Sequence, residues 1–335
     1  MPTIRDVARL ANVSVATVSR VLNGSSKVSE QSRRAVLEAQ KELSFCLNAN
    51  ARALAHQDSE IIGATVPDLY DPYFGALIRS CERTAQLQGF TLLVLQTFHD
   101  VERERRAIDT LLSHQCRGLI IHALTLPEME LAAYMRRVPF MVLINRTLKG
   151  FEERCVGIDD LKGEYLVVKE LLSQGHRDIA FVGSNHRIHD AFDRHAGYVK
   201  ALKEAGITPD PRLLINVEPY MEGGAEAARE LLARKVPFTA VACYNDYMAA
   251  GFMAELGEAG YRVPDDISVT GFDDLFLASC LTPKLTTVHH PVDEMGKEAV
   301  LLSTSLYNHD EEPYKLTNFD VSVVRRKSVG PVRQG

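Results

Sequence analysis

Residues 3–23 read TIRDVARLANVSVATVSRVLN, a pattern that predicts two short helices joined by a tight turn. Thr3 stands three residues before Asp6, which is the spacing of a capping box at the start of a helix. Ser14 is placed to cap the second helix, whose inner face carries Val18 and Leu22. Apolar side chains recur at helical spacing in the first helix: Ile4, Val7, Ala8 and Ala11. The stretch therefore predicts a helix-turn-helix over residues 4–23.

The outer face of the second helix carries small or polar side chains: Val15, Ala16, Thr17, Ser19 and Arg20. Small side chains let a helix approach the major groove of DNA closely, and hydroxyl and guanidinium groups bind phosphates or a guanine edge. Val15 and Ala16 offer no hydrogen bonds, so we expect them to read DNA through apolar contact and shape. A helical hairpin with ordinary capping has the same pattern, so this stretch alone leaves both interpretations open.

The segment after the second helix predicts a third helix and then a linker. Ser29 is placed to cap the third helix, in which Val36, Leu37 and Leu43 are the apolar positions. Residues 48–57 read NANARALAHQ, which is helix-prone but nearly without apolar anchors. A helix of this kind is marginal in water by itself. We therefore expect the linker to become helical only when another surface supports it.

The rest of the chain alternates short apolar strands with amphipathic helices. The expected strands include residues 61–66, 91–95, 118–121, 140–144, 179–182, 240–243 and 268–271. The expected helices include residues 74–88, 102–113, 164–174, 191–204, 225–234 and 247–258. This alternation predicts an α/β body of two doubly wound parallel sheets, each covered on both faces. Chain crossovers near 159–163 and 285–292 would make two lobes with a ligand cleft at the strand carboxyl ends.

Charge and cysteine usage constrain the class of protein. The chain has 335 residues, which is too long for one compact core. Residues 1–57 hold 8 Lys and Arg against 4 Asp and Glu, whereas the remainder holds 30 against 40. A basic head on an acidic body suits a DNA-binding module with an independent partner domain, although a short window can reach this surplus by chance. Six scattered cysteines support neither a disulfide framework nor a zinc knuckle.

The sequence has no secretory leader and no apolar run of about 18 residues that would cross a bilayer. We therefore expect the protein in a reducing cytoplasm, without membrane contact. The pair His186 and His189 has metal-like spacing but lacks further ligands, and His289 and His290 are interpreted as surface or packing residues. Glycine-rich phosphate loops, a dinucleotide fingerprint and a nucleophile elbow are also missing. We expect no metal, no cofactor and no enzymatic activity.

Several long motifs resemble those of the lactose/galactose repressor family. They are IRDVA at 4–8, VSVATVSRVLN at 13–23, DPYF at 71–74, VLINR at 142–146, GHRDIA at 175–180, ND at 245–246, GFDD at 271–274 and LTTV at 285–288. The resemblance implies a DNA-binding headpiece over 1–57 with a hinge helix at 48–57, and a sugar-binding, dimerising body over 58–335. That body would resemble periplasmic sugar-binding proteins, with an N-lobe at about 60–160 and 291–318 and a C-lobe at about 161–290 and 319–330.

Sugar recognition requires carboxylates and amides for hydroxyl groups, an arginine, and an aromatic face for the ring. Eight residues after strands or early in helices supply this set, and the resemblance places them in the effector pocket: Asp71, Tyr73, Phe74, Asn145, Arg146, Arg194, Asn245 and Asp273. It implies that Phe74 stacks on the sugar, that Arg194 and Asp273 anchor hydroxyls, and that Asn245 makes a bidentate contact. Taken singly, Asn245 could be only a helix cap.

The same resemblance extends the expected DNA contacts to Thr3, Ser14, Asn23 and, in the hinge, Leu54. Leu54 would enter the minor groove as a wedge and kink the duplex. Leu47 departs from the family pattern, which commonly has proline before the hinge. Losing that proline frees the backbone and is hypothesised to weaken hinge preorganisation.

These observations predict a dimeric repressor that binds double-stranded operator DNA and is released by a small sugar. The C-terminus after Arg326 has no heptad tail, so a homodimer rather than a tetramer is expected. D-galactose is the first expected effector, and another pentose, hexose or nucleobase is the near alternative. A transport solute-binding protein and a sugar-modifying enzyme using Asp71 or Asp273 as a base are the alternatives from other classes.

Overall fold

The structure is a computed structural model that describes residues 2–22, 25, 27–45, 59–310, 314 and 319–332. The chain divides into two compact units, Met1–Ser59 and Glu60–Gly335. Asn23, Leu47, Leu54 and the expected hinge at 48–57 lie outside the described residues. Within the described part of the chain, no helix is both long and apolar enough to cross a membrane.

The first unit contains three short helices packed on one another. They are α1 (Ile4–Leu10), α2 (Val15–Leu22) and α3 (Glu30–Glu42). Their buried core is made by Val7, Ala8, Val18, Val21, Val36 and Ala39. Leu37 is half exposed, so the prediction that it belongs to the apolar face of α3 is wrong. One residue along the helix from Val36, it points about 100° away from the core.

Local hydrogen bonds define where these helices begin. The backbone N–H and hydroxyl of Thr3 both donate to the Asp6 carboxylate, at 2.9 and 2.7 Å. Before α2, Asn12 adopts a left-handed conformation with φ of 50°, which asparagine tolerates better than most residues. The Ser14 hydroxyl then accepts the Thr17 N–H at 3.1 Å, and the Ser29 hydroxyl accepts the Ser32 N–H at 3.2 Å before α3. The turn chemistry expected from the sequence is therefore present.

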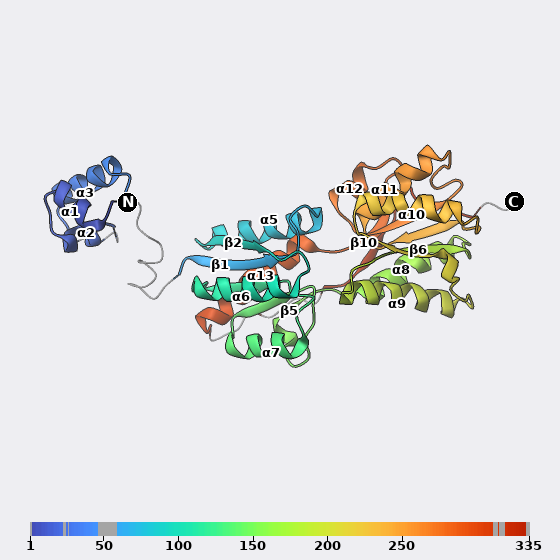
Figure 1. Cartoon of the computed structure of the whole chain (residues 1–335), viewed down its shortest axis with the longest axis horizontal. Helices are drawn as coiled ribbons and strands as arrows, with labels where there is room; N and C mark the ends of the chain where they lie inside the picture. Colours follow the sequence, from blue (N-terminus) through green and yellow to red (C-terminus); the bar gives the residue numbers. More distant parts are fainter. Residues whose placement is uncertain are drawn as a thin grey trace. The chain divides into compact units, whose positions relative to one another are not determined.

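The second unit has two lobes, each built on its own sheet (Figure 1). The first lobe holds a parallel sheet in the order β2-β1-β3-β4-β5. Its strands are β1 (Ile61–Val66), β2 (Thr91–Gln96), β3 (Gly118–Ile121), β4 (Met141–Ile144) and β5 (Cys155–Val156). Its helices are α5 (Pro72–Leu87), α6 (Val101–Ser113), α7 (Glu128–Arg137) and α13 (Val292–Asn308), with one short helical turn, η1 (Glu152–Arg154).

Both faces of this first sheet are buried, because successive strand residues point to opposite sides. On one side Val142 and Ile144 pack with Leu77 of α5 and Met295 of α13. On the other side Leu119, Ile121 and Leu143 pack with residues of α6 and α7, including Leu111 and Met135. The strands consequently read as continuous apolar runs, which is typical of parallel sheets covered by helices.

The second lobe has a sheet in the order β11-β10-β9-β8-β6-β7. Its strands are β6 (Ile179–Ser184), β7 (Leu214–Val217), β8 (Ala240–Cys243), β9 (Ser268–Asp273), β10 (Thr286–His289) and β11 (Ser322–Val324). Its helices are α8 (Asp160–Ser173), α9 (His189–Glu204), α10 (Met221–Ala233), α11 (Asp246–Glu258) and α12 (Phe276–Cys280), with a short turn η2 (Pro211–Leu213). All strand pairs are parallel except β10 with β11, so this edge departs from the fully parallel sheet that we expected.

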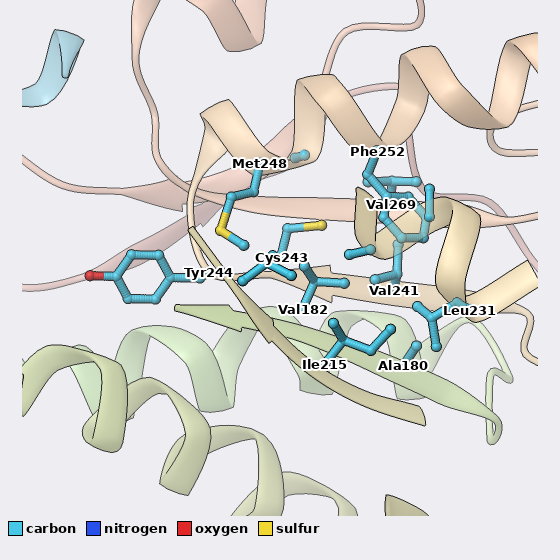
Figure 2. Packing of buried hydrophobic residues seen from close by; sticks show 14 of the residues in the cluster. Ala180, Val182, Ile215, Leu231, Val241, Cys243, Tyr244, Met248, Phe252 and Val269 are labelled. Atoms are coloured by element: carbon cyan, nitrogen blue, oxygen red, sulfur yellow. The ribbon is translucent and has the colours of Figure 1, made fainter. Parts of the chain in front are cut away.

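One face of the second sheet packs on α10 and α11. Figure 2 shows Val182, Val241 and Cys243 of the strands beneath Met248 and Phe252 of α11. In the same view, the ring of Tyr244 extends away from this cluster. The hydroxyl of Tyr244 donates to Asp190 at 2.8 Å. Tyr244 thereby links the edge of this core to Asp190 of α9.

The chain passes between the lobes at three places. It leaves the first sheet after β5 and enters α8, and it returns between β10 and α13. The third passage precedes β11, because Phe319 packs in the first lobe and Val321 in the second. The α/β class and the two-sheet architecture predicted from the sequence are confirmed.

Candidate functional site

The outer face of α2 is exposed in the first unit. Val18 and Val21 are buried, which turns Val15, Ala16 and Arg20 toward solvent. Val15 is 41% exposed, a large fraction for an apolar residue in a helix that also contributes to a core. Thr17 and Ser19 are partly buried, and the Thr17 hydroxyl lies 2.9 Å from that of Ser14. Five residues predicted to contact DNA therefore lie on α2, and Ser14 caps its start, whereas Thr3 precedes α1. Asn23 and Leu54 are not described.

The second unit contains a cavity lined by both lobes, with an empty volume of about 530 Å³, part of it open to solvent. Seven of the eight residues predicted to bind an effector line it: Asp71, Tyr73, Phe74, Asn145, Arg194, Asn245 and Asp273. Residues more than 200 positions apart in the sequence thus meet around one space.

Arg194 is the central cation of the cavity and is almost fully buried. Its Nε donates to Asp160 at 2.9 Å, its Nη1 donates to the Tyr244 carbonyl at 2.6 Å, and its Nη2 lies 3.6 Å from Asp273. The guanidinium also lies 3.6 Å from the ring centroid of Phe272. Burial disfavours its charge, but the adjoining carboxylates hold its pKa well above the usual value. Arg194 therefore stays charged and holds the carboxylates of α8 and β9 in place.

The two lobes are joined by a hydrogen-bond chain through Tyr73. The Tyr73 hydroxyl donates to Asn145 Oδ1 at 2.9 Å, and it lies 3.0 Å from Nε2 of His290. Since Tyr73 has a single proton, the His290 nitrogen must be the donor in this pair. Asn145 adopts φ of 58°, a left-handed conformation that turns its amide toward Tyr73 at the end of β4.

Two carboxyl groups in the cavity have strongly shifted acidity. Burial raises the pKa of both Asp71 and Asp273 to about 7. Asp71 caps α5 by accepting the Tyr73 N–H at 2.9 Å. Asp273 sits at the end of β9 with φ of 108°, a sparsely populated conformation of the kind that concentrates at functional sites. Both groups are enclosed acceptors for a ligand that carries hydroxyl donors.

Asn245 acts as a helix cap and still faces the cavity. Its Oδ1 accepts the Met248 N–H at 2.8 Å, and its Nδ2 donates to the Pro219 carbonyl at 3.0 Å. A primary amide has two donors and two acceptor positions, so one of each remains. The cap and the ligand contact are consequently compatible at this position.

Arg146 is the predicted site residue that does not line the cavity. Its Nη1 donates to the carbonyls of Ala123 and Leu126, at 2.6 and 3.0 Å. Glu104 holds the same segment from the other side by accepting the N–H groups of Leu124 and Leu126, at 3.1 and 2.8 Å. The prediction that Arg146 lines the pocket is therefore wrong, because its guanidinium is used to fix the loop after β3.

Several cavity residues were missed by the sequence prediction: His99, His122, Asp160, His186, Asp190, Tyr244 and His290. His122 directly follows β3 and His99 follows β2, which is the placement that had selected Asn145. The same placement therefore applies to them, whereas the sequence prediction singled out histidine only at 186 and 189, for their metal-like spacing, and at 289 and 290, as surface or packing residues. His290 is buried as a packing residue and also lines the cavity.

The cavity suits a small neutral ligand with many hydroxyl groups. Four carboxyl groups face it, those of Asp71, Asp160, Asp190 and Asp273, against the single guanidinium of Arg194. Phe74 presents an aromatic surface beside them, with its ring packed edge-on against Tyr73 at 5.1 Å. Among the described residues, no group of three or more His, Cys, Asp or Glu is placed to hold a metal ion. Acceptors, one cation and an aromatic ring are the set that sugar recognition requires.

Comparisons with known proteins agree with this architecture. The profile of "Bacterial regulatory proteins, lacI family" matches residues 3–48, and that of "Periplasmic binding protein-like domain" matches residues 168–329. The chain is 48% identical to the HTH-type transcriptional regulator GalR of Escherichia coli K12, over 98% of this chain and 96% of the relative. It is 44% identical to GalS of Salmonella typhimurium LT2, over 90% and 89%.

A solved structure of similar organisation is the lac repressor dimer bound to operator and the anti-inducer ONPF. It is 28% identical to this chain, with a TM-score of 0.82, and the match covers 98% of this chain and 99% of the other. The resemblance extends over both units of the sequence.

Proposed function

This chain belongs to the lacI family of bacterial regulatory proteins and is a DNA-binding transcriptional regulator, and from that premise we propose that it represses sugar-utilisation genes in the cytoplasm until a small sugar releases it. The observation that carries the proposal is the cavity. Carboxylates, one buried guanidinium and an aromatic ring converge there from both lobes.

The operator contact belongs to the exposed face of α2. Val15, Ala16 and Arg20 are turned outward, while Val18 and Val21 anchor the helix in its own core. Small residues at the start of the helix allow close approach to the major groove, and Arg20 suits a phosphate or a guanine edge. Ser14, Thr17 and Ser19 supply hydroxyls at the start of α2 and along it, and Thr3, Asn23 and Leu54 complete the proposed set.

D-galactose is the effector that we propose first. Its support is the identity of 48% and 44% with GalR and GalS over nearly the whole chain, together with a cavity that suits a neutral monosaccharide. In the proposed pocket, Phe74 packs against the apolar face of the ring, and Arg194, Asp273 and Asn245 bind hydroxyls. A repressor of the same family that responds to another sugar or to a nucleobase is the alternative.

The proposed action requires the two functions to be coupled. A ligand shifts a two-state equilibrium only if it binds one state more tightly. We place the coupling in the lobe arrangement of the body, over about 60–160 with 291–318 and 161–290 with 319–330, and in the hinge at 48–57. In this proposal the hinges of a homodimer become helical on DNA only when the bodies hold them close together.

Two binding measurements test this proposal. Duplexes that bind the full chain are first selected from random DNA, and fluorescence anisotropy then gives their affinity with and without saturating D-galactose. Calorimetry against a panel of monosaccharides and nucleosides identifies the ligand. The proposal expects D-galactose to bind unchanged in structure and to weaken DNA binding. Tight DNA binding that persists at saturating galactose would sink the inducer role.

A further inference from the structure

Three histidines gather at one end of the cavity. His99 and His122 come from the first lobe, after β2 and β3, and His186 comes from the second lobe, after β6. The ring centroids of His99 and His186 are 4.7 Å apart, and those of His99 and His122 are 6.3 Å apart. The ring of His122 also packs edge-on against Phe74 at 4.9 Å. This trio therefore spans both lobes and adjoins the proposed sugar-stacking ring.

The surrounding protein holds the ring of His186 and the backbone beside His122. Nε2 of His186 lies 3.1 Å from the Glu218 carboxylate, whose other oxygen accepts from Asn185 at 2.9 Å. A carboxylate accepts only, so Nε2 carries a proton and donates to Glu218. His122 stands at the start of the segment that Glu104 and Arg146 hold by its backbone. The trio is built into the fold rather than carried on free surface loops.

One ring nitrogen of each histidine in the trio has no hydrogen-bond partner among the residues that the structure describes. In the described part of the chain, Nδ1 of His99, His122 and His186 is each enclosed and without a hydrogen-bond partner. His122 is buried to 2% exposure. Enclosed polar atoms in native proteins are normally paired, so three unpaired nitrogens at one place call for an explanation. A ligand or ordered water that pairs with them would remove the cost of leaving them unsatisfied.

The charge at this end favours a neutral partner. Burial lowers the pKa of His99 to about 4 and that of His122 to about 3, so both rings are neutral at pH 7. A neutral imidazole offers one donor and one acceptor, which matches a hydroxyl group. The acidic groups nearby are Glu218, Asp190 and Asp68, and Arg146 is the cation that acts on His122. The Arg146 guanidinium already donates to the Ala123 and Leu126 carbonyls, so an anionic group such as a phosphate would meet mainly acidic neighbours here.

We propose that His99, His122 and His186 form a hydroxyl-binding subsite that determines which sugar the cavity accepts and that ties the two lobes together through one ligand hydroxyl. The inference rests on the proposed sugar function and names the residues that discriminate among sugars of similar size. Arg194 and its carboxylates bind the ligand at one end of the cavity. The histidines bind its hydroxyl groups at the other end and so select for their arrangement. A missing or inverted hydroxyl leaves these nitrogens unpaired, which is a strong basis for rejection.

The test is a cycle that combines ligand and protein changes, measured by calorimetry on the full chain. The ligands are D-galactose and its monodeoxy analogues. The proteins are the wild type, His99→Leu, His186→Leu and, as a matched control, His195→Leu. His195 follows Arg194 on α9 and packs against Phe181 outside the cavity. Circular dichroism and thermal unfolding establish that each variant is folded.

One analogue is expected to bind the wild type about tenfold more weakly than D-galactose, as the loss of one buried hydrogen bond implies. In His186→Leu that penalty should shrink to less than about twofold, because the partner of the hydroxyl is gone. His186→Gln keeps a polar group at this position and should restore part of the discrimination. His195→Leu should leave every ratio as in the wild type.

The subsite would be overturned if the loss of affinity for each analogue were the same in folded His99→Leu and His186→Leu as in the wild type. Ordered water or packing would then account for the unpaired histidine nitrogens. Tighter binding of galactose 1-phosphate than of galactose would also overturn it. Failure of the galactose proposal can be distinguished from failure of the subsite, because the wild type would then bind a different sugar of the panel. The same cycle is then run with that sugar and its deoxy analogues. Absence of binding by every neutral sugar overturns both proposals.

Discussion

The outer face of α2 and the cavity of the body are two binding regions that are built in different ways. The α2 face is one short helix whose outward residues, Val15, Ala16 and Arg20, are exposed, and its cap is made by Ser14 and Thr17, three residues apart. The cavity gathers buried charged groups from strands and helices that are far apart in the sequence. The α2 face depends on a small core of six buried residues, whereas the cavity depends on the packing of two complete lobes.

This difference explains what each region tolerates. Small exposed side chains on α2 can change with little effect on folding, because surface substitutions away from special features cost little. Arg194 cannot change alone, since two carboxylates are buried against it. Mutations therefore separate the two regions. Substitutions on the α2 face should alter DNA binding without loss of stability, whereas substitutions at the centre of the cavity should also destabilise the body.

The largest expected effect comes from Arg194→Met. Removing the guanidinium leaves Asp160 and Asp273 buried without their cation, which should destabilise the body by about 3–5 kcal/mol. Sugar binding should be lost with it. Urea unfolding followed by tyrosine fluorescence measures the first effect, and calorimetry measures the second. Arg187→Met, at an exposed position seven residues earlier, is the control and should change neither. Wild-type stability in Arg194→Met would contradict the account of this end of the cavity.

The next effect lies in the first unit. Val18 is fully buried, and Val18→Ala should cost about 1–2 kcal/mol in a core too small to absorb the loss. DNA binding should fall steeply while the sugar affinity stays unchanged. Val15→Ala is the matched exposed change, which should keep the helical signal of the first unit and weaken DNA binding modestly. Equal loss of folding in both variants would erase the distinction between core and reading face.

A pH effect should distinguish the second lobe. Glu164 of α8 is fully buried, both carboxyl oxygens lack a partner among the described residues, and burial raises its pKa to about 8. Between its unfolded value near 4.5 and 8, the folded state keeps a proton that the unfolded state has released. Stability should therefore fall as the pH rises through this window, by at most about 1.4 kcal/mol per unit from this group.

Glu164→Met should flatten this slope and raise the melting temperature at pH 8, since an apolar side chain suits the site without a proton. Thermal unfolding between pH 5 and 8 checks both statements. Sugar affinity serves as the internal control, because Glu164 does not line the cavity. An unchanged pH slope in the folded variant would show that Glu164 is not the group responsible.

The smallest effect is expected in the linker. Proline at position 47 would restrict the unfolded chain before the proposed hinge, and such changes contribute about 0.4–1 kcal/mol where the backbone fits. Leu47→Pro should therefore raise affinity for the selected duplex severalfold at most, without altering sugar binding. Anisotropy titration at fixed salt measures it. Unchanged DNA affinity would remove the hinge-preorganisation hypothesis.

Sequence reasoning succeeded where local chemistry decides the structure. The capping of α1 and α2 by Thr3 and Ser14 follows from spacing alone, and the apolar runs locate most strands of both sheets. It overreached at Leu37, where the apolar side chain faces solvent. Hydrophobicity identifies which residues tend to be buried, but an apolar residue on the surface is common.

The cavity was predictable only in part. Asp71, Asn145 and Asp273 follow strands, so the parallel topology places them at the same end of their sheets. Arg146 follows the same strand as Asn145, yet its guanidinium turns to the loop after β3, which depends on packing that no motif records. The histidines were overlooked because histidine serves many structural and functional roles and a lone residue does not indicate which.

The central claim is that sugar binding in the cavity and DNA binding by α2 are energetically coupled. It is tested most directly by titrating D-galactose into the full chain, free and saturated with the selected duplex, in the same buffer. Linkage requires the sugar affinity to fall on DNA by the same factor by which the sugar lowers DNA affinity. The account predicts two equal factors of about 5–150, the range of typical allosteric coupling. Identical galactose affinities with and without bound DNA would contradict it.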